Sequence, residues 1–289
     1  PVARFTGALP ENEVRRWVRD AVLAGRSDDV RFALRGDLAD FPFRDPATGE
    51  FRIEAKLADA TLEYARGWPS IDRIQGRLRF ERAGMEIDVG SGRIRNVVLG
   101  RTRARLPEFA DPVLRIEGTG QGPAQDMVSF VNDSPLLTRI DDFTRDVAIR
   151  GDAKLELAFE MPLERVDATR VKGSVQFAGN DIELDRTLPP LQRLSGRLEF
   201  TEGRLALRGV RATLLGGPVA VEGDTPEQGR FLIRAQGTMP AEGLARLYDN
   251  ALTRRLAGST TYRAEVDVRA LAVLLGGALE YALVVGNDE

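Results

Sequence analysis

The chain has 289 residues and a net charge of −3, and it contains neither histidine nor cysteine. The absence of both residue types excludes Ser-His-Asp and Cys-His nucleophilic sites, histidine or thiolate metal sites, and disulfides. Because arginines alternate with acidic residues and form no basic stripe, we expect a solvated face of mixed charge and no nucleic-acid partner. We also expect no cofactor and no metal ion.

Neither end of the sequence has the pattern of a targeting or membrane-spanning segment. The first four residues include no initiating methionine and no apolar run, so no signal peptide is expected here. The apolar stretch from Ala270 to Val285 is interrupted by two glycines and Glu280, and it is shorter than the ~20 residues of a spanning helix. We therefore expect an internal segment of a larger protein.

Three segments have a helical pattern, and each follows a proline: Pro10, Pro123 or Pro240. Proline at the first helical position loses no hydrogen bond, and acidic residues in the first turn suit the helix dipole. We expect three short amphipathic helices whose apolar sides pack on the core. Their apolar residues are Val14, Trp17, Val18 and Val22, then Met127, Phe130 and Val131, then Leu244, Leu247, Tyr248, Ala251 and Leu252.

Between these helices the apolar period changes to two, which is typical of strands with one polar face. The longest alternation covers residues 147–161. Turn residues predict strands of about six to eight residues, or about 20–26 Å each, in an antiparallel meander. The predicted turns include Arg82-Ala83-Gly84, Gly90-Ser91-Gly92, Thr201-Glu202-Gly203 and Glu222-Gly223-Asp224.

The sequence repeats itself with a shift of 120 residues, because residues 55–80 align with residues 175–200 without a gap. Pro69, Arg73, Gly76, Arg77, Leu78 and Phe80 recur as Pro189, Arg193, Gly196, Arg197, Leu198 and Phe200. We predict a first helix-plus-strands repeat over residues 1–121, a second over 122–238 and a truncated third over 239–289. The fold class expected is mostly β: a repetitive antiparallel meander that forms a curved, elongated sheet or groove, with one short amphipathic helix per repeat of about 117–120 residues.

A sheet with one apolar face needs a cover, which can be a second sheet, helices or a ligand. One short helix per repeat is too small to cover about six strands. Two architectures therefore stay open. One is a closed barrel or sandwich, and the other is a curved, open sheet with an apolar lumen.

Several segments resemble a known family. They are Ser134-Pro135-Leu136, residues 149–157 (IRGDAKLEL), Met161-Pro162-Leu163, residues 171–177 (VKGSVQF), residues 191–200 (LQRLSGRLEF) and Leu215-Gly216-Gly217. Over about residues 5–270 the chain resembles the YhdP family of AsmA-like proteins of the Gram-negative envelope.

The resemblance implies a bridge-like lipid-transfer protein with an N-terminal membrane anchor and a long periplasmic β-groove. This chain would be a periplasmic middle segment that conducts phospholipid between the inner and outer membranes, with the anchor outside it. Its partners would be phospholipid acyl chains, other segments of the same parent chain and envelope membrane proteins, and it would have no catalytic residue. The expected lipid-binding lining is Ile53, Leu57, Leu78, Phe80, Leu155, Leu157, Phe159, Phe177, Leu198, Phe200 and Ile233.

Two other functions are considered. A non-enzymatic β-scaffold would bind outer-membrane proteins or assembly partners by strand addition at a sheet edge. A carbohydrate-active β-solenoid enzyme would need paired carboxylates beside aromatic platforms, and the only tryptophans are Trp17 and Trp68. We expect no enzymatic activity.

Overall fold

The computed structural model describes residues 22–63, 67–139, 144–163, 165, 168–184, 186, 188–225, 230–247 and 255–269. Within these ranges the chain is mostly β-sheet, which confirms the predicted fold class. It divides into two compact units. Unit 1 comprises residues 1–121 and 156–172, and unit 2 comprises residues 122–155 and 173–289.

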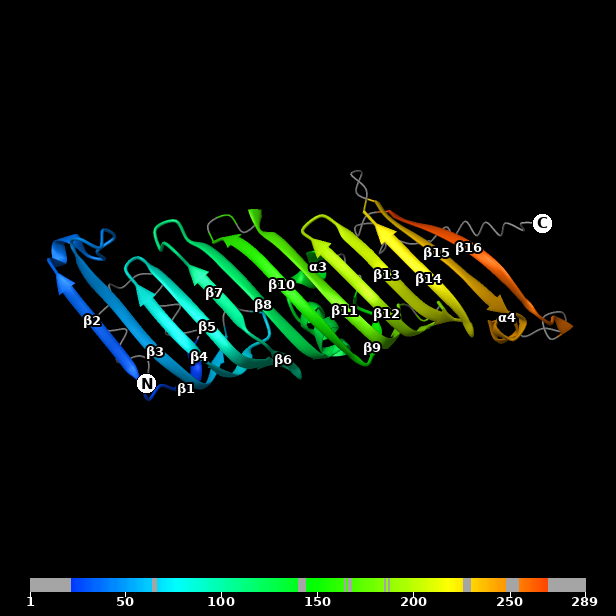
Figure 1. The fold of residues 1–289 in the computed structure, drawn as a ribbon, viewed down its shortest axis with the longest axis horizontal. Helices are drawn as coiled ribbons and strands as arrows, with labels where there is room; N and C mark the ends of the chain where they lie inside the picture. Colours follow the sequence, from blue (N-terminus) through cyan, green and yellow to red (C-terminus); the bar gives the residue numbers. More distant parts are fainter. Residues whose placement is uncertain are drawn as a thin grey trace. The chain divides into compact units, whose positions relative to one another are not determined.

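Unit 1 is an antiparallel meander in the order β1-β3-β4-β5-β6-β8, in which β2 also pairs with β3 and β7 pairs with β5 and β8 (Figure 1). The C-terminal half of β10 belongs to this unit, where Leu163 N–H donates to Pro112 O at 2.8 Å. The elements are β1 (Val22–Arg26), β2 (Val30–Gly36), the 3-10 helix η3 (Leu38–Asp40), β3 (Gly49–Leu62), β4 (Ile71–Glu81), β5 (Gly84–Ile94), β6 (Val97–Leu99), β7 (Thr102–Leu106), β8 (Val113–Pro123) and β10 (Asp152–Pro162).

Unit 2 continues the same pattern in the order β11-β12-β13-β14-β15-β16, with β9 paired to β11. Its strands are β9 (Ala148–Arg150), β11 (Arg170–Glu183), β12 (Leu191–Thr201), β13 (Leu205–Leu214), β14 (Gly217–Asp224), β15 (Arg230–Pro240) and β16 (Ser259–Arg269). Its helices are α2 (Ala124–Asn132), α3 (Leu136–Arg139) and α4 (Ala241–Leu247).

The sequence repeat is also a repeat of backbone geometry. Strands β3 and β11 both have 14 residues, and β4 and β12 both have 11. Arg73 and Arg193 have positive φ values of 54° and 52°, and each lies where the register with the next strand shifts. Positive φ is uncommon for a residue other than glycine. Its recurrence at equivalent positions therefore identifies a bulge that both repeats share. The predicted limits of the three repeats stay a prediction.

The second and third predicted helices are confirmed in their described parts. Strand β8 ends at Pro123 and α2 follows directly, and β15 ends at Pro240 and α4 follows in the same way. The first helical N–H donates to the carbonyl of a glycine in both cases, Ala124 to Gly151 at 3.0 Å and Ala241 to Gly258 at 2.9 Å. A backbone hydrogen bond thus joins the start of each helix to a residue later in the chain.

Other helix predictions have a different outcome. The first predicted helix, up to residue 21, lies outside the described residues, as do residues 248–254 of the third. Val22 is the first residue of β1, so its assignment to a helix is wrong.

The strands are longer than expected, because several glycines predicted to form turns lie inside strands. Strands β4, β5, β8, β10, β12, β15 and β16 have 11 residues each. The Gly90-Ser91-Gly92 turn is wrong, since these residues belong to β5. The Glu222-Gly223-Asp224 turn is also wrong, because these residues belong to β14. A Cβ on Gly223 would lie 2.8 Å from Cζ of Phe231, so the glycine provides space for the ring.

The single strand predicted over residues 147–161 is divided at Gly151, whose φ is 90°. Strand β9 pairs with β11 through Ile149 and Ile182. Asn180, which is 1% exposed, donates from Nδ2 to the carbonyls on both sides of the corner, Arg150 O at 3.0 Å and Asp152 O at 3.1 Å. One buried amide therefore satisfies the backbone where the strand turns.

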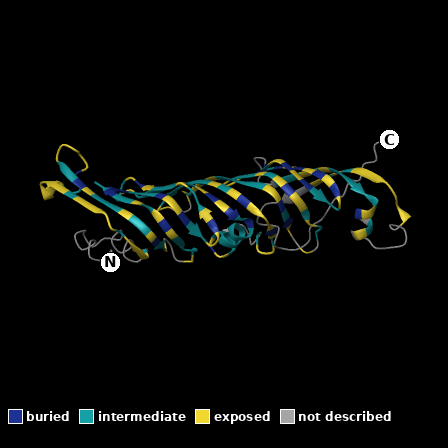
Figure 2. Cartoon of the chain, turned by 60° about the horizontal axis from the view of Figure 1, so that its bottom comes forward, coloured by how far each residue is buried: buried dark blue, intermediate teal, exposed yellow. Residues whose placement is uncertain are grey.

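Alternation along the strands places apolar and charged side chains on opposite faces, and more buried and more exposed residues alternate along the strands in the same way (Figure 2). In unit 1, Glu54, Arg79, Glu86 and Arg105 stand opposite one another on neighbouring strands. Arg79 pairs with Glu54 at 3.1 Å, and Arg105 pairs with Glu86 at 3.3 Å. Opposite charges across strands contribute roughly 0.2–1 kcal/mol per pair, so the polar face adds a modest stabilisation.

Replacement of Gly196 by alanine tests the close approach of β12 and β13. Gly196 has a φ of 129°, and an added Cβ would lie 2.6 Å from Val210 Cα. We expect Gly196→Ala to lower the free energy of unfolding by about 1–3 kcal/mol, because the neighbouring backbone has to move. Urea unfolding followed by circular dichroism measures the change.

Gly203→Ala is the matched control, because an added Cβ at Gly203 meets no atom within 4 Å. We expect this variant to change the free energy of unfolding by about 0.5 kcal/mol at most. Equal unfolding midpoints for the two variants would contradict the assigned role of Gly196.

Candidate functional site: an apolar row between covered margins

The apolar face of each unit contains a row of side chains that crosses the strands. In unit 1 the row consists of residues that face one another in register: Ala55, Leu78, Ile87, Ala104 and Ile116. In unit 2 the corresponding row is Leu198, Leu207, Gly223 and Ile233. We call these two sets the central rows. Neighbouring strands are about 4.8 Å apart, so each row is a continuous apolar strip.

The central rows have an intermediate exposure. Their side chains are neither fully buried nor exposed, and the one residue that is buried, Gly223, has no side chain. The rows contain no polar or ionisable side chain. Such a strip can bind hydrocarbon, and it offers no group for acid–base or metal chemistry.

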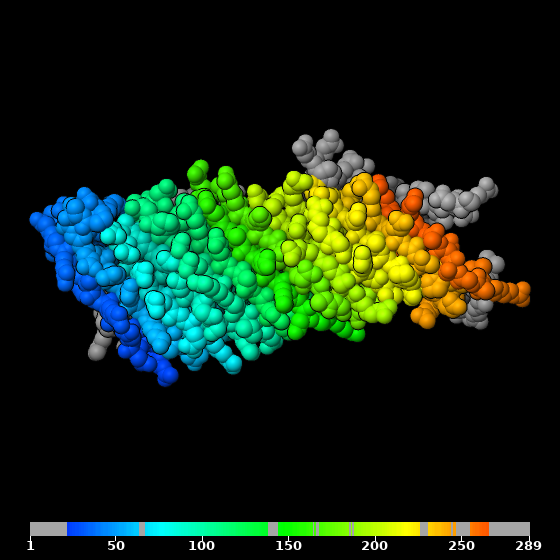
Figure 3. Space-filling view, viewed as in Figure 1, coloured from blue at the N-terminus to red at the C-terminus, as the bar shows by residue number. Residues whose placement is uncertain are grey.

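Helix α2 covers one margin of the apolar face in unit 2. Ala124 is 2% exposed and packs in a cluster with Leu194, Val210 and Val219, which are 3–5% exposed. Met127 of the same helix packs against this cluster. In Figure 1, α2 and α3 lie behind the strands of unit 2, so the space-filling view from the same direction shows the other face of that sheet (Figure 3). One short helix thus covers only a part of the face, as its length predicts.

The corresponding margin of unit 1 is a smaller cluster. Ala60, Ile74 and Val89 are 3–8% exposed, and Leu57 and Leu62 pack against them. Within the described range, the residues of this cluster and those packed against it all belong to strands.

The opposite margin of unit 1 is covered by a segment that the sequence analysis did not identify. Phe43, between η3 and β3, is fully buried and packs with Phe51, Phe80, Met85 and Leu106. Its ring lies on the β2–β3 hairpin, where a Cβ on Gly49 would be 2.5 Å from Cδ1 of Phe43. A side chain at that glycine would displace the ring.

An ion pair secures the same segment. Arg44 donates from Nε and Nη2 to the carboxylate of Glu108 at 2.9 and 3.0 Å. The hydrogen bond from Arg44 lowers the pKa of Glu108, so this carboxylate is charged at neutral pH. The pair connects the Phe43 segment to the chain after β7, beside Phe109, which packs on Phe80.

In unit 2 the equivalent margin is less buried than in unit 1. Phe200, Leu205 and Phe231 are partly buried, and none of them belongs to the three buried clusters of the described residues. Phe200 and Leu205 face each other in register. The central row of unit 2 is therefore continuous with a partly exposed aromatic margin.

The eleven expected lining residues fall into four groups. Leu78, Leu198 and Ile233 belong to the central rows, and Ile53, Leu57 and Phe177 pack against the buried clusters. Leu155, Leu157, Phe159 and Phe200 are partly buried outside those clusters. Phe80 is 6% exposed beneath Phe43, so protein already covers it. Lipid contact by any of them stays a prediction.

Sequence reasoning missed several residues of the same surface: Ile87 and Ile116 in unit 1, and Leu205, Leu207 and Phe231 in unit 2. The alternating patterns of residues 113–116 and 205–207 were available as a signal. What was missing was the register that places these residues beside Leu78 and Leu198.

Two further properties concern the described residues only. None of their helices is both long enough and apolar enough to cross a membrane. The acidic residues among them form no group of three or more that could hold a metal ion.

Comparison with known proteins identifies one family. A family model described as YhdP protein matches residues 6–272 of this chain. Neither the curated proteins nor the solved structures include a match.

Truncation of Phe43 tests whether this residue covers the margin, because the loss of a cover lowers the free energy of unfolding. We expect Phe43→Ala to lower the free energy of unfolding by about 3–5 kcal/mol, because it empties a fully buried aromatic site. Phe32→Ala is the control. Phe32 is 58% exposed and contacts Phe51 edge to face, so its loss should cost about 1 kcal/mol. Similar losses for both variants in chemical denaturation would contradict the assignment of Phe43 as the cover.

Proposed function

We propose, given that the chain belongs to the YhdP family, that it is a middle segment of a periplasmic bridge-like protein. Its apolar β-groove shields phospholipid acyl chains and conducts the lipid between the inner and outer membranes. The observation that carries this proposal is the central row, which recurs in both units as a partly exposed, uncharged strip. The row lies between two covered margins in unit 1 and beside one covered margin in unit 2.

The energetics of such a strip suit movement. Burial of each CH₂ group contributes roughly 0.8 kcal/mol. Because Leu78 and Leu198 occupy equivalent positions in the two repeats, the free energy gained from contact with these side chains is similar in each repeat. An acyl chain that leaves one repeat recovers similar contacts in the other, and no deep minimum retains it.

The separation of the two faces supports the same function. A lipid head group stays in water while its acyl chains cover the central row. No reaction step is needed, so the proposed protein is not an enzyme. The other partners in this proposal are further segments of the parent chain and envelope membrane proteins.

One observation favours a second candidate, a β-scaffold that binds an envelope protein by strand addition. Among the described strands, β2 pairs with β3 only, and its Val30, Phe32 and Leu34 are 38%, 58% and 41% exposed. An exposed apolar edge strand is a template for an added strand. This function predicts a purified chain without lipid that binds its partner through β2.

A charge on the apolar margin tests the conduit. We expect wild-type chain purified from a Gram-negative host to contain phospholipid, and Phe200→Asp to contain several-fold less, because a carboxylate opposes contact with hydrocarbon. Organic extraction followed by mass spectrometry gives the amount of lipid per chain.

The control is Thr201→Asp, which introduces the same charge at the next, exposed position. It should retain the wild-type lipid content, and circular dichroism checks that both variants fold. A lipid-free wild-type chain, or equal lipid loss in the two folded variants, would overturn the conduit and favour the scaffold.

A further inference from the structure

The polar face of unit 1 contains a hollow of about 740 Å³ over β3, β4 and β5. Its charged lining residues, such as Lys56, Arg77 and Asp88, alternate along the strands with the central row, so they lie on the opposite face. The volume is within the range of small-molecule sites. In the space-filling view, the side chains of these strands form a continuous surface (Figure 3).

The hollow has more cationic than acidic side chains. The cationic lining residues are Arg31, Lys56, Arg77, Arg101 and Arg103, and the acidic ones are Asp29, Glu54 and Asp88. The difference is five minus three, or two positive charges, on a chain whose net charge is −3.

All three carboxylates of the hollow are already engaged. Asp29 pairs with Arg31 at 3.4 Å, and Asp88 pairs with Arg103 at 2.7 Å. Glu54 pairs with Arg79, outside the hollow, at 3.1 Å. Within the described residues this arrangement leaves Lys56, Arg77 and Arg101 without an anionic partner, although all three are exposed at the hollow.

The register makes this cationic group costly to the folded chain. Lys56 and Arg77 stand directly opposite each other on β3 and β4. Asp88 stands opposite Arg77 on β5, but its carboxylate pairs with Arg103. Like charges at directly opposite positions destabilise a sheet, and neither Lys56 nor Arg77 has an acceptor atom. An anion placed between them would remove the repulsion.

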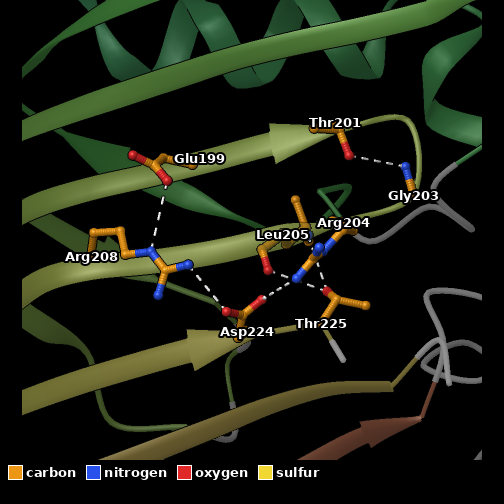
Figure 4. Close-up of polar contacts among 8 residues, drawn as sticks. All are labelled: Glu199, Thr201, Gly203, Arg204, Leu205, Arg208, Asp224 and Thr225. Carbon is orange, nitrogen blue, oxygen red and sulfur yellow. Dashed lines mark hydrogen bonds and ion pairs between the residues drawn. The ribbon is translucent and has the colours of Figure 1, made fainter. Parts of the chain in front are cut away.

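In the second repeat, an uncharged side chain occupies the position equivalent to Lys56. The positions equivalent to Lys56 and Arg77, 120 residues later, are Gln176 and Arg197. Arg197 donates from Nε to Oε1 of Gln176 at 3.3 Å. Arg208, the residue opposite Arg197, lies between Glu199 and Asp224 at 3.7 and 3.1 Å (Figure 4). The second repeat thus provides an acceptor for the guanidinium groups of both Arg197 and Arg208. At the position of Gln176, the first repeat has Lys56, which cannot accept a hydrogen bond.

From this difference we propose that Lys56, Arg77 and Arg101 form a binding site for a phosphate group. A guanidinium binds phosphate oxygens with two parallel hydrogen bonds, and a lysine ammonium adds a compact charge. Three cations around one hollow suit an anion with more than one negative charge. A free phosphate and a phospholipid head group share this chemistry. The site is on the face opposite the central row, so it does not depend on the proposed lipid groove.

Lys56→Gln is the decisive variant, because it recreates the Gln176–Arg197 pair of the second repeat. The 289-residue chain is titrated with inorganic phosphate by isothermal titration calorimetry at low salt. We expect the variant to bind phosphate about tenfold more weakly, from the loss of one charge-assisted hydrogen bond, and to unfold at the same or a higher urea concentration. Lys154→Gln removes the same charge from an exposed position outside the hollow and should bind as the wild type does.

Arg101→Gln, which changes a residue outside the strands, repeats the test should Lys56→Gln fail to fold. A second titration uses vesicles of phosphatidylglycerol in phosphatidylcholine. Vesicle binding that depends on Lys56, without binding of inorganic phosphate, assigns the phosphate to a lipid head group. Absence of binding in both titrations, or equal losses for Lys56→Gln and Lys154→Gln, would overturn the site.

Discussion

The antiparallel register is the constraint on which the whole structure depends. Because successive side chains point to opposite faces, a slip of one residue would move every apolar residue of a strand to the charged face. The bulges at Arg73 and Arg193 occur at equivalent positions, so the register shifts in the same way in both repeats. The central rows, the opposite charges on neighbouring strands and the cationic hollow all result from this pairing of the strands.

The two faces use the register differently. On the apolar face, α2 covers one margin of unit 2 and Phe43 covers one margin of unit 1, and the central rows stay partly exposed. On the polar face, ion pairs such as Arg79 with Glu54 and Arg208 with Asp224 neutralise part of the charge. The proposed phosphate site depends on one difference between the repeats. Gln176 accepts a hydrogen bond from Arg197, whereas Lys56 has no acceptor atom for Arg77.

Much of this architecture could be predicted from the sequence, because period-two alternation and the 120-residue repeat depend on local and internal patterns. Pro123 and Pro240 mark helix starts for the same local reason. Strand lengths were underestimated since Gly223 and Gly90 provide packing space or a bulge inside strands, and sequence alone does not distinguish these uses from a turn. The cover by Phe43 and the pairing of Lys56 with Arg77 depend on contacts between distant segments, which require the register itself.

The central claim is that the partly exposed apolar row contacts lipid. The most direct measurement places a photo-crosslinking amino acid at Leu198 in the central row, at Val210 beneath α2, or at Arg197 on the polar face, and identifies the lipid adducts after irradiation in cells. We expect phospholipid adducts at Leu198, few at Val210 and none at Arg197. Equal adducts at all three positions, or none at Leu198, would contradict the account.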